Sequence, residues 1–377
     1  MENFELKLAG MSSVLLIGEN GSGKSAVGQA LEVLQKIGRG TSRVSELVKV
    51  KDFSGGRADV PMRFEVETEF DGKVYEYVVA FELPTGGSDI LLREERLTAD
   101  GKVVYRRERT KVELPVLVPK ESTADPLKDM YSAALDLGIT QTVSLHNQTV
   151  GLPIIQEQFL GARPDRVHLF RYWLARILIL RPIPALMKGD ADPKVSEPNS
   201  SVSDFGAWYS GLLSHVPAAY AKMVDFLRQV MPDLKELKRP VTGENAGRLQ
   251  VEFSTGKGSV TVGLEDLSDG EKCFMVCALV LAENAGFPRI CFWDEPDNYL
   301  ALSEVGDFVM ELRRAFQSGG QFIATSHNPE AIRHFTRDST LLLFRRNHLE
   351  PTVVRPVEEL KFHGDLVGAL IRGDVEP

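Results

Sequence analysis

The sequence predicts an α/β protein with a mixed central sheet, an antiparallel β subdomain and a helical insertion. Near the start, an apolar strand over 14–17 leads through a glycine-rich turn into a helical pattern over 26–37, an order typical of a parallel sheet. Further along, a second apolar strand over 290–293 ends in two acidic residues. Between them, residues 60–118 alternate apolar with polar side chains and are divided by turn signals, which indicates an antiparallel meander.

The other elements follow in chain order. A long helical region succeeds the meander, and its clearest helices end at prolines or are interrupted by them. Two strand-like segments then lead into the second half of the sheet. The predicted strands are 64–68, 74–81, 91–97, 103–107, 249–253, 260–262 and 322–324; the helical region covers 125–237, with helices over 167–180 and 207–230, the second interrupted at Pro217.

Composition narrows the class of protein. The 377 residues carry a net charge of -9, which argues against a surface that is basic all round. No stretch approaches the roughly 18 consecutive apolar residues of a membrane-spanning helix. At the amino terminus, Phe4, Leu6 and Leu8 alternate with polar residues, which predicts a strand and not a signal peptide. We therefore expect a cytoplasmic protein with no membrane partner.

The strongest motif is GENGSGKS, which satisfies the pattern GxxxxGK[ST] between a strand and a helix. Its glycines allow successive main-chain N–H groups to point at phosphates, and the helix N-terminus adds partial positive charge. Lys24 is expected to neutralise the β and γ phosphates of ATP, and the Ser25 hydroxyl to bind Mg²⁺. The expected nucleotide contacts are Gly18, Glu19, Asn20, Gly21, Ser22, Gly23, Lys24, Ser25 and Ala26.

The motif RICFWDEP ends the second apolar strand in Asp294 and Glu295. These residues are expected at the carboxyl edge of the sheet, where open α/β sheets bind ligands. Asp294 is expected to hold Mg²⁺, and Glu295 to orient and activate the attacking water. Such a strand is structurally ordinary when it stands alone. Downstream of GENGSGKS, it predicts ATP hydrolysis.

Two shorter motifs accompany these. LSDGEK spans 267–272, and ATSHNPE places His327 directly after the strand predicted over 322–324. A serine hydroxyl and glycine N–H groups at a helix N-terminus form an anion site. Taken alone, however, LSDGEK is more simply an ordinary capped helix start.

Together, the four motifs resemble those of ABC ATPases and of their soluble branch, which includes SMC, RecF and overcoming-lysogenisation-defect proteins. The resemblance implies a P-loop NTPase fold of the ABC ATPase-head type and a head-to-tail dimer that closes around two ATP molecules. It implies that Ser268 and Gly270 bind the γ-phosphate of ATP held by the partner subunit, and that His327 contacts the same phosphate from its own subunit. LSDGEK differs from the common signature LSGGQ at Asp269 and Glu271.

Within the soluble branch, the closer resemblance is to compact bacterial ATPases of the AAA_21 group. Ser25 and Ser268 stand about 240 positions apart, and no coiled-coil heptads fill that interval. The resemblance implies an ATPase lobe with the phosphate loop and meander over 1–124 and a helical insertion over 125–240. It implies a second ATPase lobe with the signature, Walker B strand and switch histidine over 241–377.

The leading functional hypothesis is a dimeric ATP-driven switch. Many members of the AAA_21 group are encoded beside an effector nuclease in phage-defence operons, so the resemblance implies an effector protein encoded nearby as the partner. The alternative is a DNA-repair or DNA-end-sensing ATPase that clamps nucleic acid directly. Arginines gather at 106–109, 163–171 and 345–346, either as nucleic-acid contacts or as a solvated surface. Gln141 and Gln148 are the candidates for a glutamine that links ATP to the helical insertion.

Overall fold

The computed structural model describes residues 4–53, 57, 59–84, 89–115, 140–155, 166–240, 247–347, 350–362, 364–372 and 374–375. The chain forms two compact units, which we describe separately. Unit 1 comprises Met1–Gly28 and Ile177–Pro377, and unit 2 comprises Gln29–Arg176. The three segments expected from the sequence follow chain order and are not tested by this division, so they stay a prediction.

Unit 1 is built on a six-stranded sheet in the order β15-β14-β1-β13-β12-β8. Neighbouring strands are parallel except for β15, which is antiparallel to β14. The predicted mixed α/β architecture is therefore confirmed. Every residue of β1 is buried, as expected for an apolar strand covered on both faces. The strands are β1 (Ser13–Ile17), β8 (Leu178–Leu180), β12 (Ile290–Trp293), β13 (Gln321–Thr325), β14 (Thr340–Phe344) and β15 (Val353–Pro356).

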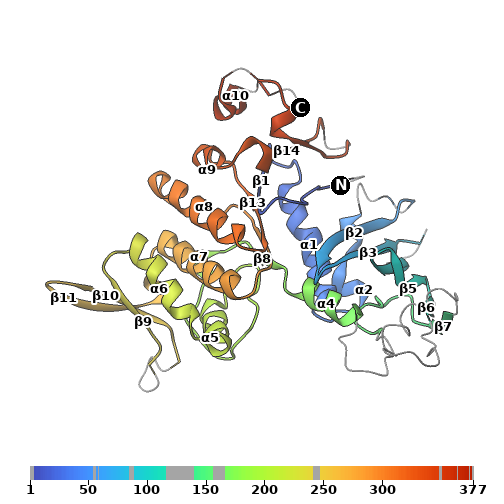
Figure 1. Ribbon diagram of the computed structural model, residues 1–377, viewed down its shortest axis with the longest axis horizontal. Helices are drawn as coiled ribbons and strands as arrows, with labels where there is room; N and C mark the ends of the chain where they lie inside the picture. The colour runs from blue at the N-terminus through green and yellow to red at the C-terminus, as the bar shows by residue number, and fades with distance from the viewer. Residues whose placement is uncertain are drawn as a thin grey trace, which may run out of the picture. The chain divides into compact units, whose positions relative to one another are not determined.

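Helices pack around this sheet (Figure 1), and α7 is buried along most of its length. Its Phe274 ring lies 5.8 Å from the Phe308 ring of α8, which in turn lies 5.6 Å from the Trp293 ring of β12. Aromatic packing in the core therefore connects α7 and α8 to the end of β12. The helices are α1 (Lys24–Gly38, which continues into unit 2), α5 (Phe205–His215), α6 (Ala219–Val230), α7 (Asp269–Gly286), α8 (Leu302–Gln317), α9 (Pro329–Arg333) and α10 (Leu366–Arg372), with 3₁₀ turns at Pro184–Leu186, Leu264–Asp266, Arg337–Ser339 and Val357–Glu359.

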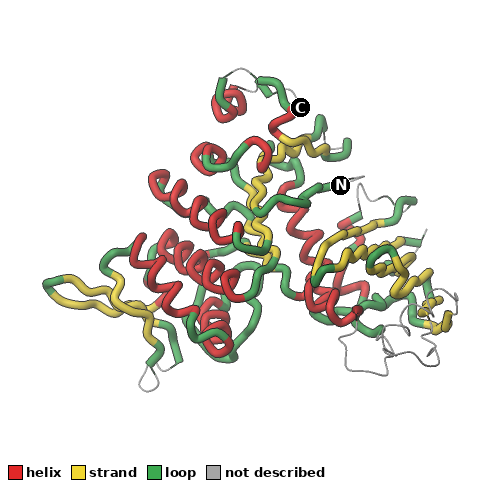
Figure 2. The backbone as a smooth tube through the Cα atoms, viewed as in Figure 1, coloured by secondary structure: helices red, strands yellow, loops and turns green. Residues whose placement is uncertain are grey.

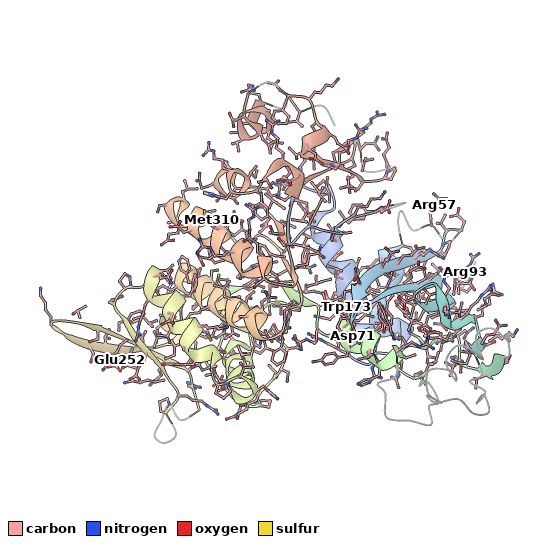
Figure 3. The ribbon with its side chains drawn as sticks, viewed as in Figure 1. Arg57, Asp71, Arg93, Trp173, Glu252 and Met310 are labelled. Carbon is pink, nitrogen blue, oxygen red and sulfur yellow. The ribbon has the colours of Figure 1, made fainter. Side chains whose placement is uncertain are left out.

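A three-stranded antiparallel sheet extends from unit 1 beside α6 (Figure 1). It consists of β9 (Leu234–Lys238), β10 (Gln250–Thr255) and β11 (Gly258–Gly263). Glu252 on β10, labelled in Figure 3, forms ion pairs with Lys235 and Lys238 of β9. Hydrogen bonds from these lysines lower the pKa of Glu252 to about 2. This cross-strand cluster therefore stays charged at neutral pH.

Unit 2 contains an antiparallel sheet, drawn in yellow in Figure 2. Its six strands have the order β2-β3-β4-β5-β6-β7. Phe170 of α4 stacks on Tyr75 of β3 and on Trp173, with ring centroids 5.6 and 5.9 Å apart. The four predicted meander strands are all present, and β6 and β7 extend them. The strands are β2 (Met62–Phe70), β3 (Lys73–Glu82), β4 (Leu91–Ala99), β5 (Lys102–Glu108), β6 (Lys111–Pro115) and β7 (Thr140–Ser144); α2 (Val44–Leu47), a 3₁₀ turn at Val50–Asp52 and α4 (Arg166–Ala175) accompany them.

A buried ion pair lies inside unit 2. Arg107 Nη1 of β5 is 3.8 Å from Glu95 Oε2 of β4, and neither side chain is exposed to solvent. Glu95 accepts hydrogen bonds from the hydroxyls of Tyr77 and Tyr105 and from the main-chain N–H groups of Gly151 and Leu152. Arg107 donates to four main-chain carbonyls, those of Arg109, Leu145, His146 and Thr149. The pair therefore ties the segment after β7 to the sheet.

Three sequence predictions are wrong in detail. The helix predicted over 167–180 ends at Ala175, and Leu178–Leu180 form β8. A continuous apolar run fits a buried strand as well as a helix, and here pairing with β12 decides the outcome. The region predicted as helical over 125–237 also contains β7 and the start of β9, and residues 4–8 form no strand. The interruption at Pro217 is confirmed, because it separates α5 from α6.

Several of the grouped arginines make contacts within the chain. Arg107 is buried, while Arg106 and Arg109 pair with Glu108 and Glu82. Arg171 donates to the Pro153 carbonyl. Arg163 lies outside the described residues. Within the described part of the chain, no helix has both the length and the apolar character needed to cross a membrane.

Candidate functional site

The glycine-rich loop joins β1 to α1 in a shape that only glycine tolerates. Gly18, Gly21 and Gly23 have φ angles of 147°, 78° and 106°, values that L-residues with a Cβ rarely adopt. A Cβ on Gly18 would lie 2.1 Å from the Leu343 carbonyl oxygen of β14. A residue far along the sequence also holds the loop, because the Thr352 hydroxyl donates to the Ser22 carbonyl at 2.8 Å.

Lys24, the first residue of α1, lies back over this loop. Its ammonium donates to the carbonyls of Gly18 and Glu19 at 2.8 and 3.0 Å. Burial lowers the pKa of Lys24, while the nearby Glu295 and Asp294 carboxylates act in the opposite direction. The Ser22 hydroxyl beside it is buried and has no hydrogen-bond partner among the described residues. The loop therefore offers a cation and a buried hydroxyl, which suit a phosphate chain bound by a glycine-rich loop at a helix N-terminus.

The acidic pair follows β12 and meets the end of the neighbouring strand β13. The hydroxyl of Thr325, the last residue of β13, donates to Asp294 Oδ1 at 2.6 Å and accepts from the Glu295 N–H at 2.9 Å. Glu295 itself has a φ of 52°, the left-handed region that is uncommon outside glycine. One buried hydroxyl thus fixes the Asp294 carboxylate and the backbone at Glu295, which the sequence motif alone did not indicate.

His327 lies beside Glu295, with 3.9 Å between His327 Nε2 and Glu295 Oε1. Partial burial, aided by the Lys24 charge, lowers the pKa of His327 below its usual value, although Glu295 and Asp294 oppose this. The imidazole is therefore neutral at pH 7. Asn298 donates to the other oxygen of Glu295.

A second buried carboxylate joins the loops after β12 and β13. Asp297 accepts a hydrogen bond from the Ser326 hydroxyl at 2.9 Å, and the same hydroxyl accepts from the Asn328 N–H at 2.9 Å. Burial raises the pKa of Asp297. The contact fixes the loop that contains Glu295 against the loop that contains His327.

The Arg181 side chain reaches the site from the end of β8. Its Nε lies 3.4 Å from Asp294 Oδ2, and its Nη2 donates to the Ser25 carbonyl at 3.1 Å. Asp294 and the exposed Ser25 are the two expected protein ligands of Mg²⁺. A hydroxyl and a carboxylate are hard oxygen donors of the kind that Mg²⁺ binds together with substrate phosphates, so the residues present fit this metal.

Ser268 is the N-cap residue of α7 and is exposed to solvent. Its hydroxyl accepts from the Glu271 N–H at 3.3 Å, and Glu271 accepts from the Ser268 N–H at 2.7 Å, a reciprocal capping box. A Cβ on Gly270 would lie 3.1 Å from the Tyr299 carbonyl. The ordinary capped helix start is thus present, and it is compatible with an anion site at the same helix end.

The structure places Lys24, the acidic pair and His327 after β1, β12 and β13 of the same sheet, with Glu295 and His327 side by side. Neither of the two candidate glutamines can be assigned to this group of residues. Gln148 belongs to unit 2 and donates to Asp89 at 3.3 Å, whereas the Gln141 side chain lies outside the described residues. Sequence reasoning missed Thr325, Ser326 and Arg181. The two hydroxyls follow a predicted apolar strand and could have been found from that position.

The sheet holds a strand, a glycine-rich loop and a helix, and two strands away it holds a parallel strand that ends in two acids; this arrangement is that of a P-loop NTPase. The family model described as "AAA domain, putative AbiEii toxin, Type IV TA system" matches residues 13–333. The chain belongs to this family, AAA_21.

Solved structures of SMC heads are similar to the chain over most of its length. The SMC head bound to the C-winged helix domain of ScpA is 17% identical, with a TM-score of 0.45, and the match covers 92% of this chain and 91% of that one. The SMC head domain from Thermotoga maritima is 15% identical, with a TM-score of 0.41 and coverage of 91% and 89%. The Smc head with an extended coiled coil from Pyrococcus furiosus, bound to the C-terminal domain of ScpA, is 14% identical, with a TM-score of 0.43 and coverage of 92% and 90%. A search of curated proteins found no match.

Proposed function

We propose that the protein binds and hydrolyses ATP as a dimeric switch. The observation that carries the proposal is geometric: Lys24 follows β1, and Asp294 and Glu295 follow β12, so opposite charges lie at the carboxyl edge of one parallel sheet. Parallel strands end there, and ligands of open α/β sheets bind at that edge. Family membership supports the same class of activity.

Each residue has a distinct task in this proposal. Lys24 exchanges its contacts with the loop carbonyls for the β and γ phosphates. Glu295 accepts a proton from the attacking water. Asn298 donates to its carboxylate, and Thr325 accepts from its main-chain N–H and so fixes the backbone at this position. Neutral His327 donates a hydrogen bond to the γ-phosphate. When bound, Mg²⁺ supplies charge neutralisation between the phosphates, with Ser25 and Asp294 as its protein ligands.

Replacing Lys24 with alanine is expected to weaken ATP binding about 100-fold, because it removes a charge-assisted contact that is made away from bulk water. Equilibrium dialysis with labelled ATP measures the change. Lys36→Ala is the matched control, since Lys36 lies later in α1 and pairs with Glu32 on the surface. A folded Lys24→Ala protein with ordinary affinity for ATP would contradict the proposed phosphate site.

We further propose that each ATP site is shared between two subunits. Lys24, Glu295 and His327 come from one subunit, and Ser268 and Gly270 come from its partner. The exposure of Ser268 at the start of α7 supports this arrangement. A two-fold dimer makes both sites equivalent, so lesions on opposite sides of the site should complement each other.

Lys24→Ala and Ser268→Arg are each expected to be inactive alone, and their mixture active. In a mixed dimer, one site contains both lesions and the other contains none. Random exchange makes half of the dimers mixed, so independent sites give about a quarter of the wild-type ATPase activity. A phosphate-release assay measures it, with subunit exchange verified on tagged chains. Full activity of Ser268→Arg by itself would leave LSDGEK as a helix start and nothing more.

Control of a partner effector protein is the most specific part of the proposal. The family description, a putative toxin of a type IV toxin–antitoxin system, is in keeping with a role in such a system, and the packing of α7 against α6 offers a route from Ser268 to the other helices. Purification of the natively expressed protein with and without ATP identifies such a partner. DNA binding that strengthens with ATP and weakens with salt would favour the nucleic-acid clamp instead.

A further inference from the structure

We propose that Arg181 is a resident cation of the ATP site, which neutralises Asp294 while no metal ion is bound and gives way when Mg²⁺ arrives with the nucleotide. This inference rests on the proposed function. It concerns a residue that belongs to none of the sequence motifs, and it assigns that residue a task that can be measured by binding alone.

The first step is the position of the guanidinium group. Arg181 lies between the two expected protein ligands of the metal, with Nε 3.4 Å from Asp294 Oδ2 and Nη2 3.1 Å from the Ser25 carbonyl. The other oxygen of Asp294 is already bonded by Thr325. The Asp294 oxygen that faces Arg181 is therefore the one left for a cation.

The second step is that the fold reserves space for this side chain. A Cβ on Gly28 of α1 would lie 2.6 Å from Arg181 Nη2 and 2.4 Å from the Phe292 ring. A methyl group at position 28 would thus collide with the guanidinium group. The strand register also positions Arg181. Leu180 of β8 pairs with Trp293 of β12, and the next residues along the two strands are Arg181 and Asp294.

The third step is electrostatic. The side chains of Arg181 and Asp294 are 28% and 12% exposed, so water screens their interaction only in part. ATP brings negative charge toward Asp294. Without metal, Arg181 acts together with Lys24 to offset the repulsion between ATP and Asp294. With Mg²⁺ present, a divalent ion takes over that task, and the arginine contributes little.

The test compares binding of a fluorescent ATP analogue in Mg²⁺ and in EDTA. For Arg181→Ala, we expect affinity in EDTA to fall about tenfold, the equivalent of one uncompensated charge interaction of moderate strength. Affinity in Mg²⁺ should change less than about threefold. Arg181→Lys should restore part of the binding in EDTA. Arg314→Ala is the matched control, because Arg314 is an exposed arginine of α8 that pairs with Glu311.

A double-mutant cycle isolates the pair. In an Asp294→Asn background there is no carboxylate to neutralise, so Arg181→Ala should no longer weaken binding in EDTA. An equal loss in Mg²⁺ and in EDTA would identify Arg181 as an ordinary phosphate ligand and overturn the inference. No loss in either buffer would overturn it also, as would an undiminished effect in the Asp294→Asn background.

A failure of the proposed function gives a different result from a failure of this inference. In that case the wild-type protein itself binds the analogue in neither buffer. Thermal melting of each nucleotide-free variant separates a folding defect from a binding defect, and Arg181→Lys keeps the test open if the alanine variant is unstable. The inference about Arg181 is therefore tested on variants only after the wild-type protein has been shown to bind ATP.

Discussion

Glu295→Gln is expected to lower the rate of ATP hydrolysis by about 100- to 10,000-fold, the usual contribution of a positioned general base. The amide keeps the shape of the carboxylate and its contact with Asn298, but it cannot accept the proton of the attacking water. ATP should still bind, because Lys24 and the phosphate loop are unchanged. Closed dimers with unhydrolysed ATP should therefore accumulate.

Two measurements check this expectation. Phosphate release gives the rate, and sedimentation in Mg-ATP gives the population of dimers. Glu311→Gln on α8 is a suitable control, since its carboxylate pairs with Arg314 and has no part in the site. Hydrolysis by Glu295→Gln at the wild-type rate would remove Glu295 from its proposed role and direct attention to the other carboxylates of the loop.

Arg107→Met is expected to destabilise unit 2 by about 3 to 5 kcal/mol, because it leaves the Glu95 charge buried without its partner. Four main-chain carbonyls would lose their donor as well. Replacing both members, as Arg107→Met with Glu95→Gln, should cost less than the single change, since a neutral amide is cheaper to bury than an isolated charge.

Hydrogen exchange of the full chain measures this effect locally. The N–H groups of Gly151 and Leu152 donate to Glu95 at 2.6 and 2.8 Å, and they should lose protection in Arg107→Met. Arg106→Met is the control on the same strand, because Arg106 points outward and pairs with Glu108 at the surface. Equal protection in the two variants would mean that the buried pair does not hold this segment.

The sequence was sufficient for those parts of the site in which chemistry is local. Gly18, Gly21 and Gly23 are needed for the backbone angles of the loop, and Asp294 and Glu295 end an apolar strand, so short motifs reveal them. Such features depend on a few adjacent residues. They were predictable for that reason.

Arg181, by contrast, was hidden by an ambiguity of pattern. The apolar run over 177–180 suits a helix and a buried strand equally, and only its pairing with β12 brings Arg181 beside Asp294. Glu95 and Arg107 were hidden in another way. Both are charged residues in alternating strands, and the sequence does not reveal that they face inward toward each other.

The support of the phosphate loop also bears on where the functional part of the chain ends. The family match closes at residue 333, yet the carbonyl against Gly18 belongs to Leu343, and the hydroxyl bonded to the Ser22 carbonyl belongs to Thr352. A chain cut at the family boundary would retain every motif residue and lose both supports. We therefore expect the smallest fragment with an intact phosphate loop to be longer than the segment that the family model matches, so truncation or fusion should leave β14 and β15 intact.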